Sequence, residues 1–241
     1  TLSVGVLANY NSALNEGIHF YPGIDASFRI GDNVRLYGSW NRALRMPTFT
    51  DLYYEGKTNK GNPDLKPEES EAFEVGLKYN TYFLRAHIAG FYRKGKNMID
   101  WVKEKPEDIW ESQNLTKVDN LGFETNLSLL PRELGNERFF IRKIELGYAF
   151  IHQDKDSEGY ISNYALDYLK HKFTAQLSHS IWKGFSATWY VRWQDRAGSY
   201  TKYENLKPAY EEPYAPYCLV DMKVNWEYQR LNLYAELNNL L

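Results

Sequence analysis

The sequence predicts an all-β fold in which antiparallel strands run up and down along almost the whole chain. Apolar and polar residues alternate with a period of two in one segment after another, whereas the spacing of an amphipathic helix is hard to find. The predicted connections are short and long in turn, as expected when each strand returns beside the previous one. These observations predict a sheet of about eleven strands.

The alternation is clearest at 70–79, where Phe73 and Val75 point to one face and Glu74 points to the other. The same pattern recurs at 185–193. Strands are predicted at 2–10, 22–30, 33–42, 70–79, 82–102, 118–129, 139–153, 168–181, 185–196, 217–227 and 229–237.

The connections between these strands differ in length from one rim to the other. Short ones are predicted at 31–33, 80–81, 182–184 and 228–229, with 131–138 somewhat longer. Long ones are predicted at 11–21, 43–69, 103–117, 154–167 and 197–216. Short turns on one rim and long loops on the other indicate an up-and-down antiparallel barrel, and in outer-membrane barrels these face the periplasm and the outside respectively. A soluble β-sandwich has less reason to keep its loop lengths so one-sided.

Composition excludes some classes of protein. The 241 residues carry 29 basic and 31 acidic side chains, a net charge of −2, which argues against a nucleic-acid partner. No stretch approaches the roughly 20 consecutive apolar residues of a spanning helix. The mean hydropathy of −0.60 leaves a membrane barrel open, because alternating residues average out. The single cysteine, Cys218, is expected to be an ordinary strand residue.

The polar faces of the predicted strands are too ionic for the packed interior of a small barrel. They carry Glu74, Lys78, Gln176, Arg192, Asp221, Lys223, Asn225 and Glu236. We therefore predict a wide, polar lumen, with the apolar faces turned to membrane lipid. Aromatic residues near strand ends suit a girdle at the lipid–water boundary, namely Trp40, Tyr79, Trp101, Trp182 and Trp226. The period alone also allows them to be core residues of a sandwich.

Two segments around the longest loop are more specific than the period. Residues 41–54 read NRALRMPTFTDLYY and residues 61–70 read GNPDLKPEES. Together they closely resemble the paired boxes in the C-terminal half of TonB-dependent outer-membrane receptors. The segments FEVGLKY at 73–79, GFE at 122–124 and LYAELNNL at 233–240 continue the resemblance, and the last looks like the penultimate strand of that family. The resemblance spans nearly the whole chain.

The resemblance implies a transmembrane barrel of roughly twenty-two strands closed around an N-terminal plug, of which these strands are about half. Residues 1–241 are expected to form the C-terminal portion of that barrel, without the plug domain and the last strand. An outer-membrane location is implied, with import of a scarce nutrient driven by energy from the TonB complex. The nutrient is expected to be a siderophore, a cobalamin-like compound or a glycan. The TonB contact is expected in the missing N-terminal part.

Five residues of the boxes are interpreted as setting loop geometry: Arg45, Pro47, Asn62, Pro63 and Pro67. The prolines remove backbone donors and stiffen the loop, and Gly61-Asn62 permits a turn with positive φ. An alternative gives Arg45, Asp51 or Asn62 a contact with substrate.

Aromatic residues crowd the long loops on the predicted outer side, and flat rings stack on sugars, corrin-like rings or aromatic chelates. The candidate substrate-binding residues are Tyr53, Tyr54, Trp110, Tyr160, Tyr164, Tyr200 and Tyr203. The alternative for each is that it packs one loop on another.

Catalysis and metal binding find little support in the sequence. Glu68, Glu69 and Glu71 cluster, yet they indicate a solvated rim rather than the paired carboxyls of a glycosidase. No nucleophile elbow or phosphate-binding loop is found. His171 and His179 share a face but lie about 26 Å apart along a strand, too far to share an ion. We predict no enzyme activity, no cofactor and no metal site.

A second hypothesis belongs to a different class: a soluble or surface-exposed all-β module that binds carbohydrate without transport. Its apolar face would be buried against a second sheet, whereas that of the receptor would meet lipid. A passive porin fits less well, because it would not carry the boxes around residues 43–70.

Overall fold

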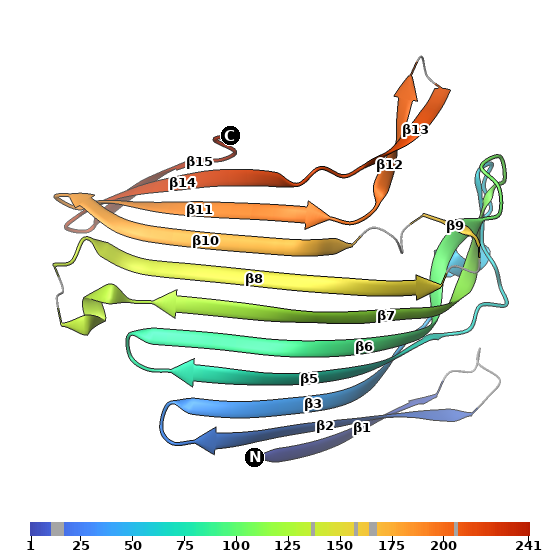
Figure 1. The fold of residues 1–241 in the computed structure, drawn as a ribbon, viewed down its shortest axis with the longest axis horizontal. Helices are drawn as coiled ribbons and strands as arrows, with labels where there is room; N and C mark the ends of the chain where they lie inside the picture. Colours follow the sequence, from blue (N-terminus) through green and yellow to red (C-terminus); the bar gives the residue numbers. More distant parts are fainter. Residues whose placement is uncertain (11–16, 136–137, 157–158, 164–167, 205–206) are drawn as a thin grey trace.

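The computed structural model describes residues 1–10, 17–135, 138–156, 159–163, 168–204 and 207–241 (Figure 1). In this part of the chain, eleven strands follow one path through a single sheet, each antiparallel to its neighbours. The path runs β1 (Leu2–Tyr10), β2 (Ile18–Ile30), β3 (Val34–Arg45), β5 (Glu68–Asn80), β6 (Leu84–Lys103), β7 (Trp110–Leu129), β8 (Ile141–Asp156), β10 (Leu169–Trp182), β11 (Phe185–Arg196), β14 (Tyr217–Tyr228) and β15 (Leu231–Leu237).

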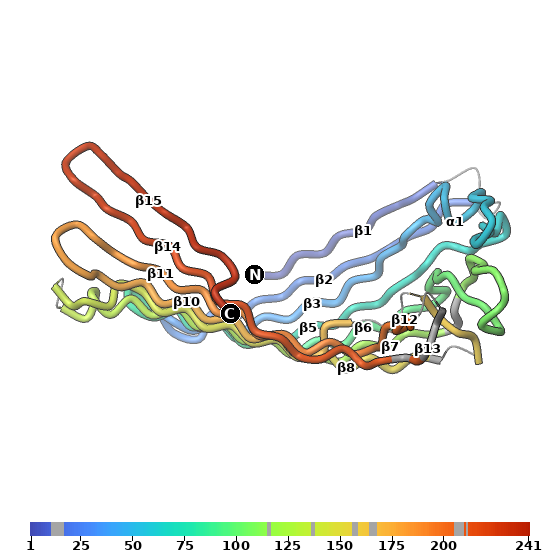
Figure 2. Tube along the Cα trace, turned by 90° about the horizontal axis from the view of Figure 1, so that it is seen from above, coloured from blue at the N-terminus to red at the C-terminus, as the bar shows by residue number. Residues whose placement is uncertain are grey.

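The predicted up-and-down order is confirmed. Figure 1 shows the short turns together at one end of the sheet and the long connections at the other. We call these ends the turn rim and the outer rim. The sheet is curved into a trough rather than flat, as a barrel wall must be (Figure 2).

The long connections contain elements that the alternation does not predict. The connection at 43–69 holds α1 (Phe49–Tyr53) and β4 (Asn59–Lys60), and β9 (Ile161–Ser162) pairs with β6. The long connection predicted at 197–216 has these bounds, between the end of β11 and the start of β14, but it holds a hairpin of β12 (Ser199–Glu204) and β13 (Lys207–Pro213) that was not predicted. The loop predicted at 103–117 is too long, since β7 already begins at Trp110. Beyond the membrane both faces of a strand meet water, so no period of two marks it.

The helices of the described residues are short. They are α1 and the 3-10 helix η1 (Pro131–Leu134), which lies in the longest connection of the turn rim. No helix in this part of the chain is long and apolar enough to cross a membrane.

One face of the sheet is apolar and uncovered. The pairing aligns Trp40, Phe73, Tyr92 and Leu121 in one row across four strands. Large side chains of this face stand open, with Val75 63% and Leu121 57% exposed. The only other sheet among the described residues is the β12–β13 hairpin, which projects from the outer rim. The soluble-module hypothesis required this face to be buried against a second sheet, and within the described part of the chain it is not.

The opposite, concave face is polar. It forms a hollow of about 620 Å³ whose lining includes Lys78, Gln176, Arg192 and Asp221, four of the residues predicted to face the lumen. Several polar groups of this face pair with one another. The Tyr37 hydroxyl donates to Glu74 Oε1 at 2.7 Å. A wet or polar interior is what allows such residues to line a barrel wall.

The predicted aromatic girdle needs one correction. Trp40 lies beside Phe73 with ring centroids 6.5 Å apart, and Trp226 stacks on Tyr228 at 5.8 Å. Trp101 does not belong with them. It lies nine residues beyond Tyr92, the β6 residue in the row with Trp40 and Phe73, and so about 30 Å further out at roughly 3.3 Å per residue. There it packs edge-on against Tyr54 of the β3–β5 connection instead of meeting lipid.

Candidate functional site

The connection between β3 and β5 packs on the outer ends of β6 and β7 and forms a small core there, which we call the outer cluster. It holds six buried side chains: Asp51, Leu65, Glu68, Asp100, Val102 and Ser112. The barrel wall lacks such a core because it is a single layer. The outer cluster therefore fixes the shape of this rim.

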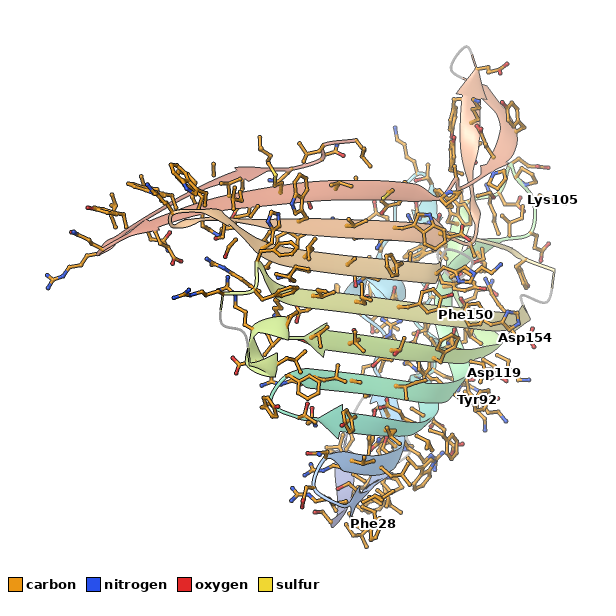
Figure 3. All side chains as sticks on the ribbon, turned by 60° about the vertical axis from the view of Figure 1, so that its left-hand side comes forward. Phe28, Tyr92, Lys105, Asp119, Phe150 and Asp154 are labelled. Carbon is orange, nitrogen blue, oxygen red and sulfur yellow. The ribbon has the colours of Figure 1, made fainter. Side chains whose placement is uncertain are left out.

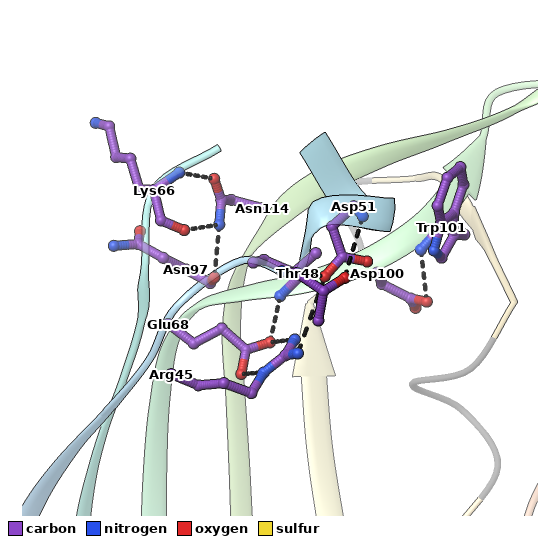
Figure 4. A network of polar contacts seen from close by, with 10 residues as sticks. Arg45, Thr48, Asp51, Lys66, Glu68, Asn97, Asp100, Trp101 and Asn114 are labelled. Atoms are coloured by element: carbon purple, nitrogen blue, oxygen red, sulfur yellow. Dashed lines mark hydrogen bonds and ion pairs between the residues drawn. The ribbon is translucent and has the colours of Figure 1, made fainter. Parts of the chain in front are cut away.

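An ion pair joins the two ends of the connection. Arg45 and Glu68 face each other in the β3–β5 register. Arg45 Nε donates to Glu68 Oε2 at 2.5 Å and Nη2 donates to Oε1 at 2.6 Å, a two-pronged contact with strong directionality (Figure 4). The backbone N–H of Ile99 donates to Glu68 Oε1 at 2.8 Å, which ties the pair to β6. The hydrogen bonds that Arg45 donates to Glu68 raise the pKa of Arg45.

The helix α1 is capped by residues of the first box. The N–H of Asp51 donates to Thr48 Oγ1 at 3.1 Å, and the N–H of Thr48 donates to Asp51 Oδ2 at 2.9 Å. This capping box satisfies two donors that the helix itself leaves unpaired. Pro47, which directly precedes Thr48, has no donor to satisfy. A helix start is thus encoded locally in the first box.

The second box crosses over this helix. The N–H of Asn62 donates to the Asp51 carbonyl at 2.9 Å, and Asn62 Oδ1 accepts from the N–H of Asp64 at 2.9 Å across Pro63. Gly61 passes so close to α1 that a Cβ atom there would lie 2.8 Å from the Leu52 carbonyl carbon. Glycine is required at this position by close backbone approach rather than by a turn.

Two further polar residues hold the cluster, and sequence reasoning missed both. Asn114 Oδ1 accepts from the N–H of Lys66 at 2.8 Å, while its Nδ2 donates to the carbonyls of Lys66 and Asn97 at 2.9 and 2.7 Å (Figure 4). Asp100 accepts from Ser162 Oγ and lies 3.7 Å from Lys155 Nζ, joining β9 and β8 to β6. No spacing rule marks these residues, because their partners are distant in sequence.

The structure divides the candidate aromatic residues between two places on the outer rim. Four lie on or beside the outer cluster, namely Tyr53, Tyr54, Trp110 and Tyr160. Trp110 lies under Lys103, whose Nζ is 4.5 Å from the ring centroid. Tyr160 lines a hollow of about 300 Å³ with Lys103, Glu104, Asp108 and Glu111. Tyr164 lies outside the described residues.

Tyr200 and Tyr203 lie on the β12–β13 hairpin instead. Tyr203 is 66% exposed. The Tyr200 hydroxyl donates to Glu212 Oε2 at 3.1 Å, and Lys202 Nζ lies 3.0 Å from the same oxygen. Hydrogen bonds from Lys202 and Tyr200 lower the pKa of Glu212. On the hairpin, Tyr200 is therefore fixed by its hydrogen bond to Glu212, which also pairs with Lys202.

These groups suit non-covalent binding. The rim offers flat aromatic rings together with carboxylates and ammonium groups around its hollows, and aromatic rings with a few well-placed polar groups are common in small-molecule sites. Among the described residues, no three His, Cys, Asp or Glu side chains are placed to share a metal ion.

Comparison with known proteins places the chain among membrane receptors. Residues 5–240 match the family model described as "TonB dependent receptor-like, beta-barrel". The vitamin B12 transporter BtuB of Vibrio vulnificus is 28% identical over 134 residues, covering 50% of this chain and 21% of that protein. The iron-regulated outer membrane virulence protein of Vibrio cholerae is 27% identical over 185 residues, covering 68% of this chain and 27% of that protein. The chain thus spans about a quarter of the length of these curated relatives.

Solved structures share the fold. A variant of the ferric enterobactin receptor PfeA of Pseudomonas aeruginosa, in complex with enterobactin, aligns with a TM-score of 0.74 at 20% identity and covers 99% of this chain and 37% of that one. The siderophore receptor PirA of the same organism aligns with a TM-score of 0.70 at 17% identity, covering 99% and 39%. The all-β barrel fold and the outer-membrane location predicted from the sequence are confirmed, and the family contains transporters rather than enzymes.

Proposed function

This chain belongs to the TonB-dependent receptor-like β-barrel family, and from that premise we propose that the whole protein is an outer-membrane receptor for a scarce nutrient. It binds the nutrient at the cell surface and imports it with energy delivered by the TonB complex. Residues 1–241 supply the C-terminal portion of the barrel wall and several of its outer loops. The contact with TonB and the plug that gates the lumen come from other parts of the protein.

The observation that carries this proposal is the position of the outer cluster. It stands at the end of the sheet where the long connections gather (Figure 1). The polar hollow lines the concave face of the same sheet, nearer to the turn rim. A ligand held at this rim lies at the entrance to the lumen. The ion pairs and hydrogen bonds of the cluster give that entrance a fixed shape, which lowers the entropy lost on binding.

We propose a siderophore or a cobalamin-like compound as the nutrient. The relatives named above are a vitamin B12 transporter and an iron-regulated protein, and the PfeA structure contains enterobactin. Trp110 and Tyr160 lie beside the hollow of the outer cluster and offer rings for stacking on such a ligand. We assign further contacts with the nutrient, outside this hollow, to Tyr53 and Tyr54 of the outer cluster and to Tyr200 and Tyr203 of the hairpin. Arg45, Pro47, Asn62, Pro63 and Pro67 are assigned to loop geometry.

The experiment is ligand binding by the full-length receptor in detergent, with a ferric catecholate siderophore, a ferric hydroxamate siderophore, cyanocobalamin and an oligosaccharide as probes. We expect one of the metal-containing probes to bind. Changing Trp110→Ala together with Tyr160→Ala should weaken that probe about tenfold to a hundredfold, because each lost aromatic contact contributes about 1 kcal/mol. The matched control is Tyr82→Ala, an exposed tyrosine on the turn rim.

Transport is tested separately in cells. Uptake of the bound probe should stop when TonB is deleted, while binding at the surface persists. Uptake that continues without TonB would contradict the energy source, and preference for the oligosaccharide would contradict the proposed nutrient.

A further inference from the structure

Two arginine side chains meet on one serine hydroxyl at the turn rim. Arg132 of η1 donates from Nη2 to Ser180 Oγ at 2.6 Å, and Arg142 of β8 donates from Nε to the same oxygen at 2.8 Å. The pairing of β8 with β10 skips Arg142, a bulge of the kind that redirects a side chain. The two donating nitrogens therefore lie within about 5.4 Å of each other, the two distances laid end to end. Positive charges at this separation repel each other.

The carboxylates near this pair do not neutralise it. Neither guanidinium group has a carboxylate oxygen within 4.0 Å in the described part of the chain. Glu133 follows Arg132 in η1 and is exposed. Glu145, on the same strand as Arg142, is paired with Lys143, whose Nζ lies 2.8 Å from Glu145 Oε1. Two guanidinium charges thus remain side by side.

The hydrogen bonds at Ser180 leave several donors unused. A serine hydroxyl has two lone pairs and one hydrogen, and here both lone pairs accept from arginine. Among the described residues its hydrogen has no acceptor. Arg132 Nε donates to the carbonyl of Phe139 at 2.8 Å, which holds that guanidinium in place while further N–H groups of both arginines stay available. Three donor groups therefore adjoin one another.

The site belongs to the concave side of the sheet. Ser180 lies four residues beyond Gln176 on β10, so the two share a face, and Gln176 lines the polar hollow of that face. All three side chains of the site are half-buried, so solvent reaches them. Asp119 and Asp154 stand toward the outer rim, at the other end of β7 and β8 (Figure 3). Short turns of outer-membrane barrels face the periplasm, and a ligand therefore comes from the periplasmic solution.

We propose that Arg132, Arg142 and Ser180 bind one phosphate group, as free phosphate or as a phosphate monoester in solution. Such a group carries close to two negative charges at neutral pH and offers three acceptor oxygens. It therefore matches two guanidinium charges and three donor groups, whereas a carboxylate has one charge and two oxygens. The bound phosphate ties η1 to β8 and β10 and so fixes the longest turn of this rim. The proposal does not depend on the nutrient that the receptor imports.

The test uses the full-length receptor in phospholipid-free detergent at constant ionic strength. Inorganic phosphate is the probe, sulfate is a second dianion, and acetate supplies a carboxylate. Hydrogen exchange of residues 131–135 and 139–142 reports binding, because the bound anion joins these segments. Phosphate and sulfate should slow this exchange, and acetate should require at least about tenfold higher concentrations. The double variant R132Q/R142Q should need at least about tenfold more phosphate, since charge-assisted hydrogen bonds are the strong ones.

The matched control is R29Q/R35Q, which removes two arginines that face each other across β2 and β3 on the same rim. It should leave the effect of phosphate on residues 131–135 unchanged. Heat-modifiable migration on gels checks that each variant is a folded barrel. The absence of slowing by phosphate in the wild type would overturn the proposal, as would equal slowing in R132Q/R142Q.

Two further results would also overturn it. Acetate as effective as phosphate would show that the site takes a carboxylate. Slowing by phosphatidylglycerol nanodiscs in the absence of phosphate would show that the phosphate group comes from a lipid headgroup instead of the solution.

Discussion

The barrel wall and the outer cluster belong to one chain but are stabilised by different means. In the wall, strand pairing satisfies the backbone while side chains such as Val75 and Leu121 stand open on one face. In the outer cluster, Leu65, Val102 and Ser112 are buried by the chain itself. The wall thus depends on lipid and on the contents of the lumen, whereas the cluster carries its own core. A substitution should therefore act through the surrounding medium in the first region and through internal contacts in the second.

The largest effect is expected from a charge on the apolar face. Val75→Arg places a guanidinium within the lipid-facing band and should lower the free energy of unfolding of the full-length receptor in bilayers by about 2–4 kcal/mol. The matched control, Gln176→Arg, adds the same side chain to the polar hollow and should cost less than about 1 kcal/mol. Urea unfolding in lipid vesicles measures both. Similar losses for the two variants would show that the two faces meet the same medium.

A smaller effect is expected from breaking the ion pair of the outer cluster. Glu68→Ala leaves the Arg45 guanidinium and the Ile99 N–H without their acceptor. Because the Arg45 side chain is 49% exposed, water replaces part of the loss, and we expect about 1–3 kcal/mol of local destabilisation.

Hydrogen exchange of residues 45–68 and 97–102 measures this change, with the wall strands as an internal reference. The control is Glu71→Ala, since the pair that Glu71 forms with Arg42 is exposed on both sides and should contribute little. Faster exchange throughout the wall would mean that the cluster is not an independent unit.

A third substitution tests the close contact between Gly61 of the second box and the backbone of α1. Gly61→Ala brings a Cβ atom to 2.8–2.9 Å from backbone atoms of Leu52, Tyr53 and Tyr54, so the two segments must separate. We expect a local loss of about 1–2 kcal/mol, seen as faster proteolysis of the β3–β5 connection. Gly5→Ala meets nothing within 4 Å and should leave the cleavage rate unchanged. An unchanged rate for Gly61→Ala would argue against the packing of box on helix.

The smallest effect concerns pH and the β12–β13 hairpin. The pKa of Glu212 is lowered by hydrogen bonds from Lys202 and Tyr200. A lowered carboxyl pKa means that these contacts stabilise the folded hairpin above the pKa of a free glutamate and are lost as pH falls through the lower folded value. The hairpin should therefore loosen below about pH 4.

Hydrogen exchange of residues 199–204, corrected for the intrinsic effect of pH, measures this loosening. Glu212→Gln should remove the dependence on pH, whereas Glu204→Gln on the same hairpin should keep it. A wild-type hairpin with the same protection at pH 3 and pH 7 would contradict the assignment.

The difference between the two regions also explains what the sequence predicted. Lipid on one side and water on the other impose a period of two on the wall, so the strands at 2–10 and 185–196 have the predicted bounds. Beyond the membrane both faces meet water, and the outer end of β7 and the hairpin at 199–213, neither of which was predicted, lose that signal. Trp101 was therefore assigned to the girdle although it belongs to the outer cluster.

The sequence identified many residues of the candidate site but not the contacts between them. The boxes marked the β3–β5 connection, because proline, glycine and asparagine have local conformational preferences that are legible in one sequence. The residues that contact this connection from other strands could not be predicted from the sequence. Asn114 contacts Lys66 and Asp100 contacts Ser162, and such long-range pairings leave no spacing pattern behind.

The short strand β4 has a consequence for the order of assembly. Asn59 and Lys60 pair in parallel with Trp110 and Glu111 of β7, reaching past β5 and β6. This pairing has nothing to join until β5, β6 and β7 stand side by side, and contacts between residues so distant in sequence form slowly. We therefore expect the connection that carries the boxes to close only after these three strands have paired.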